Sequence, residues 1–173
     1  KVNGIFAFVL WQPAKQRYLI ARDAMGVIPL YVGWDPAGRL CVASELKSLI
    51  GHCSDIQTFA PGHVLDSRDV TPQNRLPLRR WFQPAWRDPA TMPTTPFDPA
   101  ALAGALEAAV HRQLMCDVPY GVLISGGVDS SLIAALAAKY ASKRIESGDQ
   151  EPAWWPQLHS FSCGLAGAPD FGP

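Results

Sequence analysis

Short apolar runs separated by polar or Pro/Gly breaks dominate the first third of the chain. The runs lie at residues 5–11, 18–21, 30–34 and 40–43. Strands at such close intervals predict an antiparallel sheet built from hairpins. A further extended piece is predicted at residues 62–66, after a proline turn. Ser44 is expected to cap a short helix that runs to about Ile50, with Glu45 in its first turn.

The periodicity changes in the second half of the chain. An apolar residue recurs every four positions, at Leu102, Leu106, Val110 and Leu114. This stripe predicts a helix to about Leu114, and Asp98 followed by Pro99 is typical of its N-terminus. An apolar run at 120–124, a glycine loop and an alanine-rich stretch then predict a strand, a turn and a helix to about Tyr140. A last strand at 158–163 would pair in parallel with the first, in a right-handed βαβ unit.

A proline-rich polar stretch separates these two patterns. Between residues 83 and 97 the chain carries four prolines among Asp, Thr and Arg residues, and such a stretch holds neither a helix nor a central strand. We therefore expect a first domain at residues 1–82, a linker at 83–97 and a second domain at 98–173. The fold class is α+β with an antiparallel sheet in the first domain and α/β with a parallel sheet in the second.

The glycine loop carries the clearest chemical signal. Ser125-Gly126-Gly127-Val128-Asp129-Ser130 lies between a predicted strand and a predicted helix. Such a loop directs backbone N–H groups and the positive end of a helix dipole toward an anion. Hydroxyls of Ser125 and Ser130 can donate to phosphate oxygens, and Asp129 can bind the accompanying Mg²⁺. The loop is no Walker A motif, because it lacks the GxxxxGK[ST] spacing. The other reading is a serine-glycine turn with an N-capping residue.

Composition excludes several classes of partner. Fifteen basic and fifteen acidic residues give no net charge, so no strong field attracts nucleic acid or an anionic membrane. No apolar run approaches the roughly 20 residues of a membrane span. No secretory signal opens the chain, and its four cysteines show no CxxC spacing, so we expect a cytoplasmic protein with reduced thiols.

The remaining conspicuous residues are expected to be structural. Arg22 and Asp23, followed by a glycine and a proline, predict a tight loop fixed by an ion pair and turn chemistry. The arginines between residues 75 and 87 are expected to form a solvated basic stretch. The four histidines have no metal-ligand spacing. Trp154 and Trp155 are expected to pack beneath the glycine loop.

Several segments resemble one enzyme family in the same order along the chain. The loop at 125–130 resembles the pyrophosphate loop of ATP pyrophosphatases, and the preceding residues 117–124 resemble its asparagine synthetase version. Residues 22–31 and 43–49 are similar to the glutaminase half of that enzyme, and residues 154–161 resemble its bacterial B type. The resemblance implies the end of an N-terminal-nucleophile glutaminase domain joined to the start of an ATP pyrophosphatase domain.

The resemblance also implies a chemistry. The family hydrolyses glutamine, passes the ammonia through a tunnel, activates the aspartate side chain with ATP as β-aspartyl-AMP, and forms asparagine. ATP and Mg²⁺ are the implied cofactors. The residues that the resemblance implies for pyrophosphate binding lie in the loop: Ser125, Gly126, Gly127, Asp129 and Ser130. The main chain of Leu123 and of Cys163 is implied to hold the adenine ring. Asp129 is the metal ligand. The thiol of Cys163 is expected to be buried and inert.

Departures from the family pattern leave the glutaminase chemistry unassigned. The family uses an N-terminal cysteine as nucleophile, whereas this chain begins with Lys1. We therefore expect the nucleophile upstream and assign no catalytic residue here. The chain is expected to be an interior fragment that is inactive alone. A homodimer is one possible assembly of the full-length protein. Two alternatives stay open: another amide-forming ligase on the same scaffold, such as a β-lactam synthetase relative, or a non-catalytic nucleotide-binding or scaffold protein.

Overall fold

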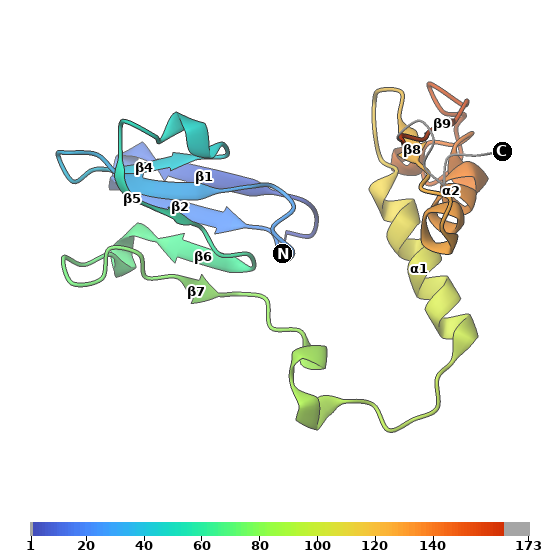
Figure 1. Cartoon of the computed structure of the whole chain (residues 1–173), viewed down its shortest axis with the longest axis horizontal. Coiled ribbons are helices and arrows are strands. Elements are labelled where there is room, and N and C mark those ends of the chain that lie inside the picture. Colours follow the sequence, from blue (N-terminus) through green and yellow to red (C-terminus); the bar gives the residue numbers. More distant parts are fainter. Residues whose placement is uncertain (1, 165–173) are drawn as a thin grey trace. The chain divides into compact units, whose positions relative to one another are not determined.

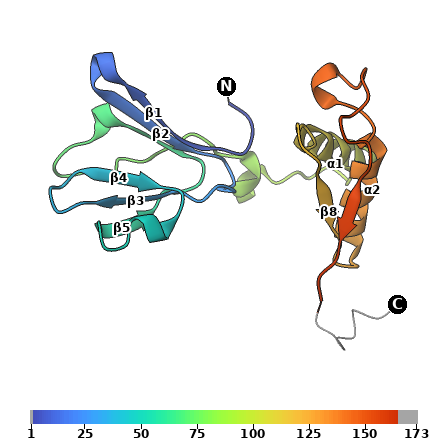
Figure 2. The ribbon, with the colours of Figure 1, turned by 90° about the horizontal axis from the view of Figure 1, so that it is seen from above.

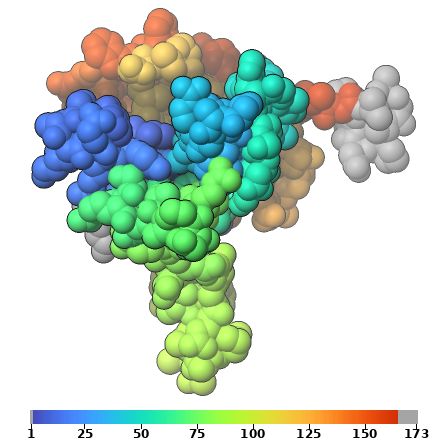
Figure 3. Space-filling model, turned by 90° about the vertical axis from the view of Figure 1, so that its left-hand side faces the viewer, coloured from blue at the N-terminus to red at the C-terminus, as the bar shows by residue number. Residues whose placement is uncertain are grey.

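A computed structural model describes residues 2–164 of the chain. The chain divides into two compact units, Lys1–Pro93 and Thr94–Pro173 (Figure 1). The division falls within the proline-rich stretch 83–97, where nearly every residue is exposed. The part of this stretch that belongs to the first unit leaves its sheets as a narrow, light-green extension (Figure 3). Among the described residues, no helix is both long and apolar enough to cross a bilayer.

The first unit contains two antiparallel sheets, which form separate layers (Figure 2). Four strands make one sheet in the order β1-β2-β6-β7: β1 is Ala7–Gln12, β2 is Arg17–Arg22, β6 is His63–Asp66 and β7 is Arg79–Arg80. Three strands make the other in the order β4-β3-β5: β3 is Tyr31–Trp34, β4 is Leu40–Ala43 and β5 is Ser54–Thr58. Short 3₁₀ helices occupy Pro13–Lys15, Leu46–Ser48, Ser67–Asp69, Ala85–Arg87 and Pro89–Thr91.

The core of this unit lies between the two sheets. Ile20 of β2 pairs with Leu65 of β6, and both are completely buried. Val32 and Trp34 contribute from β3 of the second sheet, and Leu30 and Phe59 complete the cluster. Ile20, Val32 and Trp34 come from the apolar runs that the sequence shows at residues 18–21 and 30–34. The predicted β-rich organisation is confirmed.

Two strands and one cap differ from the sequence prediction. Strand β5 was not predicted, because only Ile56 is apolar within it. Its pairing with β3 contains a register shift between Val32 and Trp34. The two-residue strand β7 carries only arginines. The predicted helix after Ser44 is a single 3₁₀ turn, Leu46–Ser48, and Glu45 rather than Ser44 precedes it, without a capping hydrogen bond. The Ser44 cap was therefore wrong.

Arg22 fixes the loop after β2, but without the predicted ion pair. Its side chain is 7% exposed, and its three nitrogens donate to the carbonyl oxygens of Ile28 at 2.7 Å, Phe59 at 2.6 Å and Gly26 at 2.8 Å. No ion pair joins it to Asp23 within the described residues. The guanidinium group presents several donors in a fixed plane, so it satisfies backbone carbonyls instead of a carboxylate.

Asp23 closes the same loop from the other side. Its Oδ1 accepts the backbone N–H groups of Met25 at 3.0 Å, Gly26 at 2.6 Å and Val27 at 3.1 Å, and its Oδ2 accepts that of Ile28 at 3.3 Å. Burial alone would raise the pKa of Asp23, yet the four N–H donors together lower it below its usual value. The structural role predicted for this dipeptide is confirmed, by turn chemistry alone.

The second unit begins with helix α1, Pro99–Gln113, which packs against helix α2, Val128–Tyr140. The Oδ1 of Asp98 accepts the N–H groups of Ala100 at 2.9 Å and Ala101 at 3.1 Å, which confirms the predicted cap. Strands β8, Gly121–Leu123, and β9, His159–Phe161, pair in parallel, as predicted. A 3₁₀ turn at Ile145–Ser147 interrupts the crossover between α2 and β9.

Candidate functional site

The glycine loop connects the carboxyl end of β8 to the amino end of α2. Gly127 precedes the helix in an extended conformation, with φ −79° and ψ 162°, and its carbonyl accepts the N–H of Ser131 at 3.1 Å. The first N–H groups of a helix have no partner inside it and carry the positive end of the helix dipole. The predicted order of strand, loop and helix is confirmed, and the amino end of α2 follows the loop directly.

The two predicted phosphate-binding hydroxyls contact each other. Ser125 Oγ and Ser130 Oγ lie 3.0 Å apart, and the N–H of Ser125 donates to Ser130 Oγ at 3.2 Å. Ser130 Oγ also lies 3.1 Å from the carbonyl oxygen of Gly127. A hydroxyl has one proton, so when Ser130 donates to Gly127 it must accept from Ser125. These bonds fold the loop into a closed turn with both hydroxyls on it.

The two glycines leave the loop backbone open to an approaching ligand. Gly126 has a left-handed φ of 83°, which side chains other than glycine adopt reluctantly. A Cβ placed on Gly126 would meet nothing within 4 Å, and one on Gly127 would meet only Ser125 Oγ, at 3.6 Å. Conformation rather than crowding therefore accounts for the first glycine. The open space on both is what close contact between an anion and the backbone requires.

The predicted adenine-binding positions lie at the same edge of the sheet as the loop. Leu123 is the last residue of β8 and pairs with Phe161, the last residue of β9. The N–H of Ile124 donates to the carbonyl of Phe161 at 2.9 Å, and Ser162 Oγ donates to that of Ile124 at 3.0 Å. Cys163 follows directly. Open α/β sheets bind ligands at the carboxyl ends of their parallel strands, so both positions border the expected location.

The environment of two predicted residues differs from expectation. Cys163 is exposed in the described structure, so its predicted burial is wrong. Trp154 and Trp155 are 63% and 54% exposed and do not form a buried anchor beneath the loop. Instead the Arg144 guanidinium lies 4.2 Å above the centre of the Trp154 ring, a cation–π contact within the crossover.

Asp129 lies in the first turn of α2 and is exposed beside the loop. Among residues 2–164, no three His, Cys, Asp or Glu side chains converge as a metal site would require. A single carboxylate still fits Mg²⁺ that arrives with a nucleotide, because this ion commonly takes one or two protein carboxylates and completes its shell with phosphate oxygens and water. Asp129 would then hold the ion next to the phosphates.

One hydroxyl of the loop was missed in the sequence. Ser131 Oγ donates to the Gly127 carbonyl at 2.9 Å, so Ser130 and Ser131 both hold the same oxygen. A serine within the first helical turn next to Ser130 was the available signal.

An apolar hollow of about 510 Å³ lies among α1, β8 and α2, lined by Leu106, Val110, Tyr120, Val122 and Ile133 among others. It offers no charged group to a phosphate.

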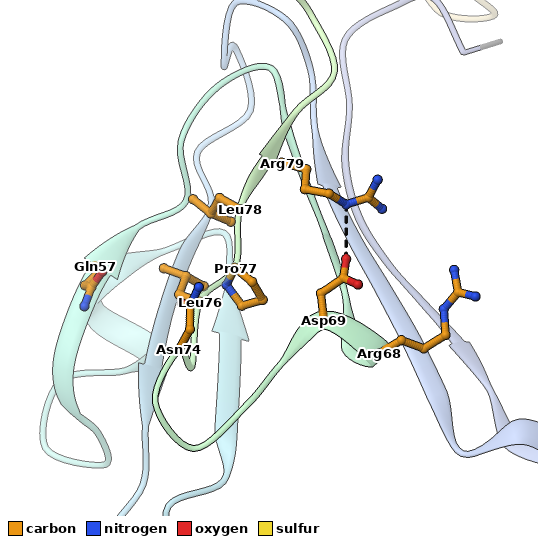
Figure 4. A pocket seen from close by; sticks show the side chains of 8 residues that line it. All are labelled: Gln57, Arg68, Asp69, Asn74, Leu76, Pro77, Leu78 and Arg79. Carbon is orange, nitrogen blue, oxygen red and sulfur yellow. Dashed lines mark ion pairs between the residues drawn. The ribbon is translucent and has the colours of Figure 1, made fainter.

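A more polar hollow in the first unit makes a weaker candidate (Figure 4). Its volume is about 750 Å³, and Arg68 and Arg79 line it together with Asp69. Arg79 Nε pairs with Asp69 at 3.1 Å, and Arg68 pairs with Asp66 at 2.9 Å. Both guanidinium groups are thus already matched by carboxylates, and the hollow retains little charge for an anionic ligand.

Both parts of the chain are similar to known protein families. Residues 101–172 match the family described as asparagine synthase, and residues 1–51 match the glutamine amidotransferase domain. The chain is 46% identical over 169 residues to asparagine synthetase B [glutamine-hydrolyzing] of Escherichia coli (strain K12). The chain is similar to one section of the glutamine-hydrolysing asparagine synthetases. The family resemblance drawn from the sequence is confirmed.

Plant members of this family give the same picture. Asparagine synthetase [glutamine-hydrolyzing] 2 of Arabidopsis thaliana and the nodule enzyme of Pisum sativum are each 43% identical over 169 residues. These alignments cover 98% of the chain, but only 29% of the Escherichia coli protein and 27% of each plant protein. The chain therefore spans less than a third of the length of these asparagine synthetases.

Proposed function

We propose that this chain belongs to a glutamine-dependent asparagine synthetase, and that its second unit binds the pyrophosphate part of ATP. The observation that carries the proposal is the loop at 125–130, which joins the carboxyl end of a parallel strand to a helix N-terminus and bears two hydroxyls. The similar proteins are named glutamine-hydrolysing asparagine synthetases, which favours this function over a β-lactam synthetase-like ligase or a non-catalytic protein.

The proposed residue roles follow from the loop's chemistry. The loop residues Ser125, Gly126, Gly127 and Ser130 donate backbone or hydroxyl hydrogen bonds to phosphate oxygens. The main chain of Leu123 and Cys163 holds the adenine ring at the edge of the sheet. Asp129 binds Mg²⁺, which supplies further neutralisation of phosphate charge. The proposed domain organisation is part of an N-terminal-nucleophile glutaminase domain at 1–82, a linker at 83–97 and part of a pyrophosphate-loop domain from 98.

The proposed reaction uses these groups to assist a leaving group. An aspartate carboxylate oxygen attacks the α-phosphorus of ATP, and pyrophosphate leaves with its bonding electron pair. Ammonia derived from glutamine then attacks the activated acyl carbon, and AMP leaves, giving asparagine. Negative charge grows on pyrophosphate as its bond to the α-phosphorus breaks, so donors already fixed at that position lower the barrier.

Substitution of Asp129 tests the proposal. In the full-length protein, Asp129→Ala should lower aspartate-dependent release of pyrophosphate from ATP by about a hundredfold or more, since it removes the metal ligand beside the leaving group. Asp55→Asn changes an exposed carboxylate in the first unit and should leave that rate unchanged. Equal rates for wild type and Asp129→Ala would refute the ATP site. Release of pyrophosphate with another carboxylate substrate, but not with aspartate, would favour the alternative ligase.

We also propose a setting for the protein. The protein is a cytoplasmic enzyme whose partners are aspartate, glutamine and ATP, without nucleic acid or a membrane surface. The equal numbers of basic and acidic residues support the last part, because they leave no strong field to attract a polyanion or an anionic membrane. A homodimer is the proposed assembly of the full-length protein. Its mass in solution, measured by light scattering, tests that assembly.

A further inference from the structure

A histidine at the end of α1 contacts the crossover that leads to β9. His111 Nε2 lies 3.0 Å from Asp149 Oδ2 and 3.2 Å from Asp149 Oδ1, although the two residues are 38 positions apart. The side chains are only 27% and 26% exposed. Among the described residues this is the one polar side-chain link between α1 and the crossover segment 142–153. Partial burial makes it a stronger contact than a fully solvated pair.

The crossover segment is closed on itself, so a contact at one residue can position the whole segment. The N–H of Ala153 donates to Ser142 O at 2.9 Å, and that of Arg144 donates to Glu151 O at 3.0 Å. The N–H of Asp149 donates to Arg144 O at 3.0 Å. Asp149 has a left-handed φ of 63°, a conformation that costs free energy for a non-glycine residue and persists where its surroundings impose it.

Charged groups from each neighbouring element face His111. The Tyr140 ring of α2 lies with its centre 4.4 Å from that of the histidine. Tyr140 donates its hydroxyl hydrogen to Glu107 of α1, and Lys139 of α2 pairs with the same carboxylate. With Asp149 these groups place two carboxylates and one ammonium around the imidazole.

We propose that His111 is a positioning residue: through its contact with Asp149 it holds the crossover segment 142–153 against α1 and so steadies β9 beside β8. The segment continues through Trp154 into β9, whose end borders the glycine loop and Cys163. The consequence for nucleotide binding rests on the proposed function; the consequence for the crossover does not.

Amide hydrogen exchange of the intact chain tests the contact without any nucleotide. Residues 144–153 should exchange roughly threefold faster in His111→Ala and in Asp149→Ala than in wild type, as expected for the loss of a partly exposed polar contact. His111→Lys, which can still donate to the Asp149 carboxylate, should restore most of the protection. His52→Gln, which changes an exposed histidine of the first unit, should behave like wild type.

Two results would overturn the inference. One is exchange of the segment in His111→Ala equal to that in wild type; the other is unchanged exchange in Asp149→Ala. In the full-length protein the KM for ATP should rise by a similar factor in His111→Ala and be restored by His111→Lys. If the exchange follows the prediction while Asp129→Ala leaves pyrophosphate release intact, the inference stands and the proposed function fails.

Discussion

Removal of the Asp23 carboxylate should destabilise the first unit more than any exposed acidic substitution. Asp23 is 2% exposed and accepts four backbone N–H groups, at distances from 2.6 to 3.3 Å. Asp23→Ala leaves these donors without the carboxylate, and a buried donor that loses its partner costs about 1–3 kcal/mol. The donors at the loop surface regain water, so we take one or two as lost and expect about 3 kcal/mol.

Amide exchange measures this loss within the first unit. A chain of two units does not unfold as one cooperative step, so a single denaturation curve would mix them. The slowest amides of β2 and β3 report the free energy of opening of the first unit instead. A loss of about 3 kcal/mol should speed their exchange roughly a hundredfold. Asp23→Asn keeps an acceptor for some of the donors and should give an intermediate effect.

A matched aspartate supplies the control. Asp69 is 43% exposed and pairs with Arg79, so Asp69→Ala should change the same exchange rates less than about fivefold. If Asp23→Ala slowed or left unchanged the exchange of β2 and β3, or affected it no more than Asp69→Ala, the loop would not depend on the carboxylate. The low pKa of Asp23 adds a pH test: its stabilising contribution is complete above the unfolded pKa near 4 and disappears as the pH falls toward the folded value.

Three further predictions use the same structure. Gly26→Ala should destabilise the first unit by more than about 2 kcal/mol, because Gly26 has φ +70° and an added Cβ would lie 2.6 Å from Pro61. Gly38→Ala, at φ +76° in open space, should cost about 1 kcal/mol, and amide exchange of β2 distinguishes the two losses of stability. Gly121→Ala should break the β8–β9 pair, since its Cβ would lie 2.4 Å from the Phe161 ring, while Gly104→Ala in α1 should be neutral or stabilising; exchange of the β9 amides gives the comparison. Hydrogen bonds from Arg68, and then from Arg17, hold the pKa of Asp66 far below its usual value. As the pH falls below about 4, the contribution of Asp66 to stability should therefore decline, and Asp66→Asn should flatten the acid side of the profile of stability against pH. A profile that the substitution leaves unchanged would contradict this role of Asp66.

Local pattern predicted those parts of the fold that depend on neighbouring residues. The apolar runs around Ile20 and Val32 indicated strands, and the Asp98-Pro99 pair indicated the start of α1. Strand β5 could not be predicted in this way, because all its residues but Ile56 are polar and its pairing partners in β3 lie 20 or more positions away. The hydrogen-bond partners of Arg22 were also inaccessible, since Phe59 reaches it only through the tertiary fold.

The candidate site divides along the same line. The residues of the loop are consecutive, so the sequence predicted their chemistry, and the resemblance supplied Leu123 and Cys163. The sequence did not reveal that Ser125 and Ser130 bond to each other, or that Ser131 shares the Gly127 carbonyl, because these contacts depend on the turn formed at Gly126. The pairing of His111 with Asp149 joins residues too distant for any periodicity to connect.

The bond between Ser125 and Ser130 sets a thermodynamic condition on whatever anion the loop receives. When Ser130 donates to Gly127, the proton of Ser125 is occupied by Ser130. An oxygen that takes this proton therefore replaces one hydrogen bond with another, and the gain is the difference between the two. That difference is small for a neutral oxygen and larger for a charged one, because hydrogen bonds to ionised acceptors are about twice as strong. The closed turn thus favours charged ligands over neutral ones. Water or a neutral ligand gains little free energy by replacing the bond between Ser125 and Ser130, so the turn stays ordered until an anion binds.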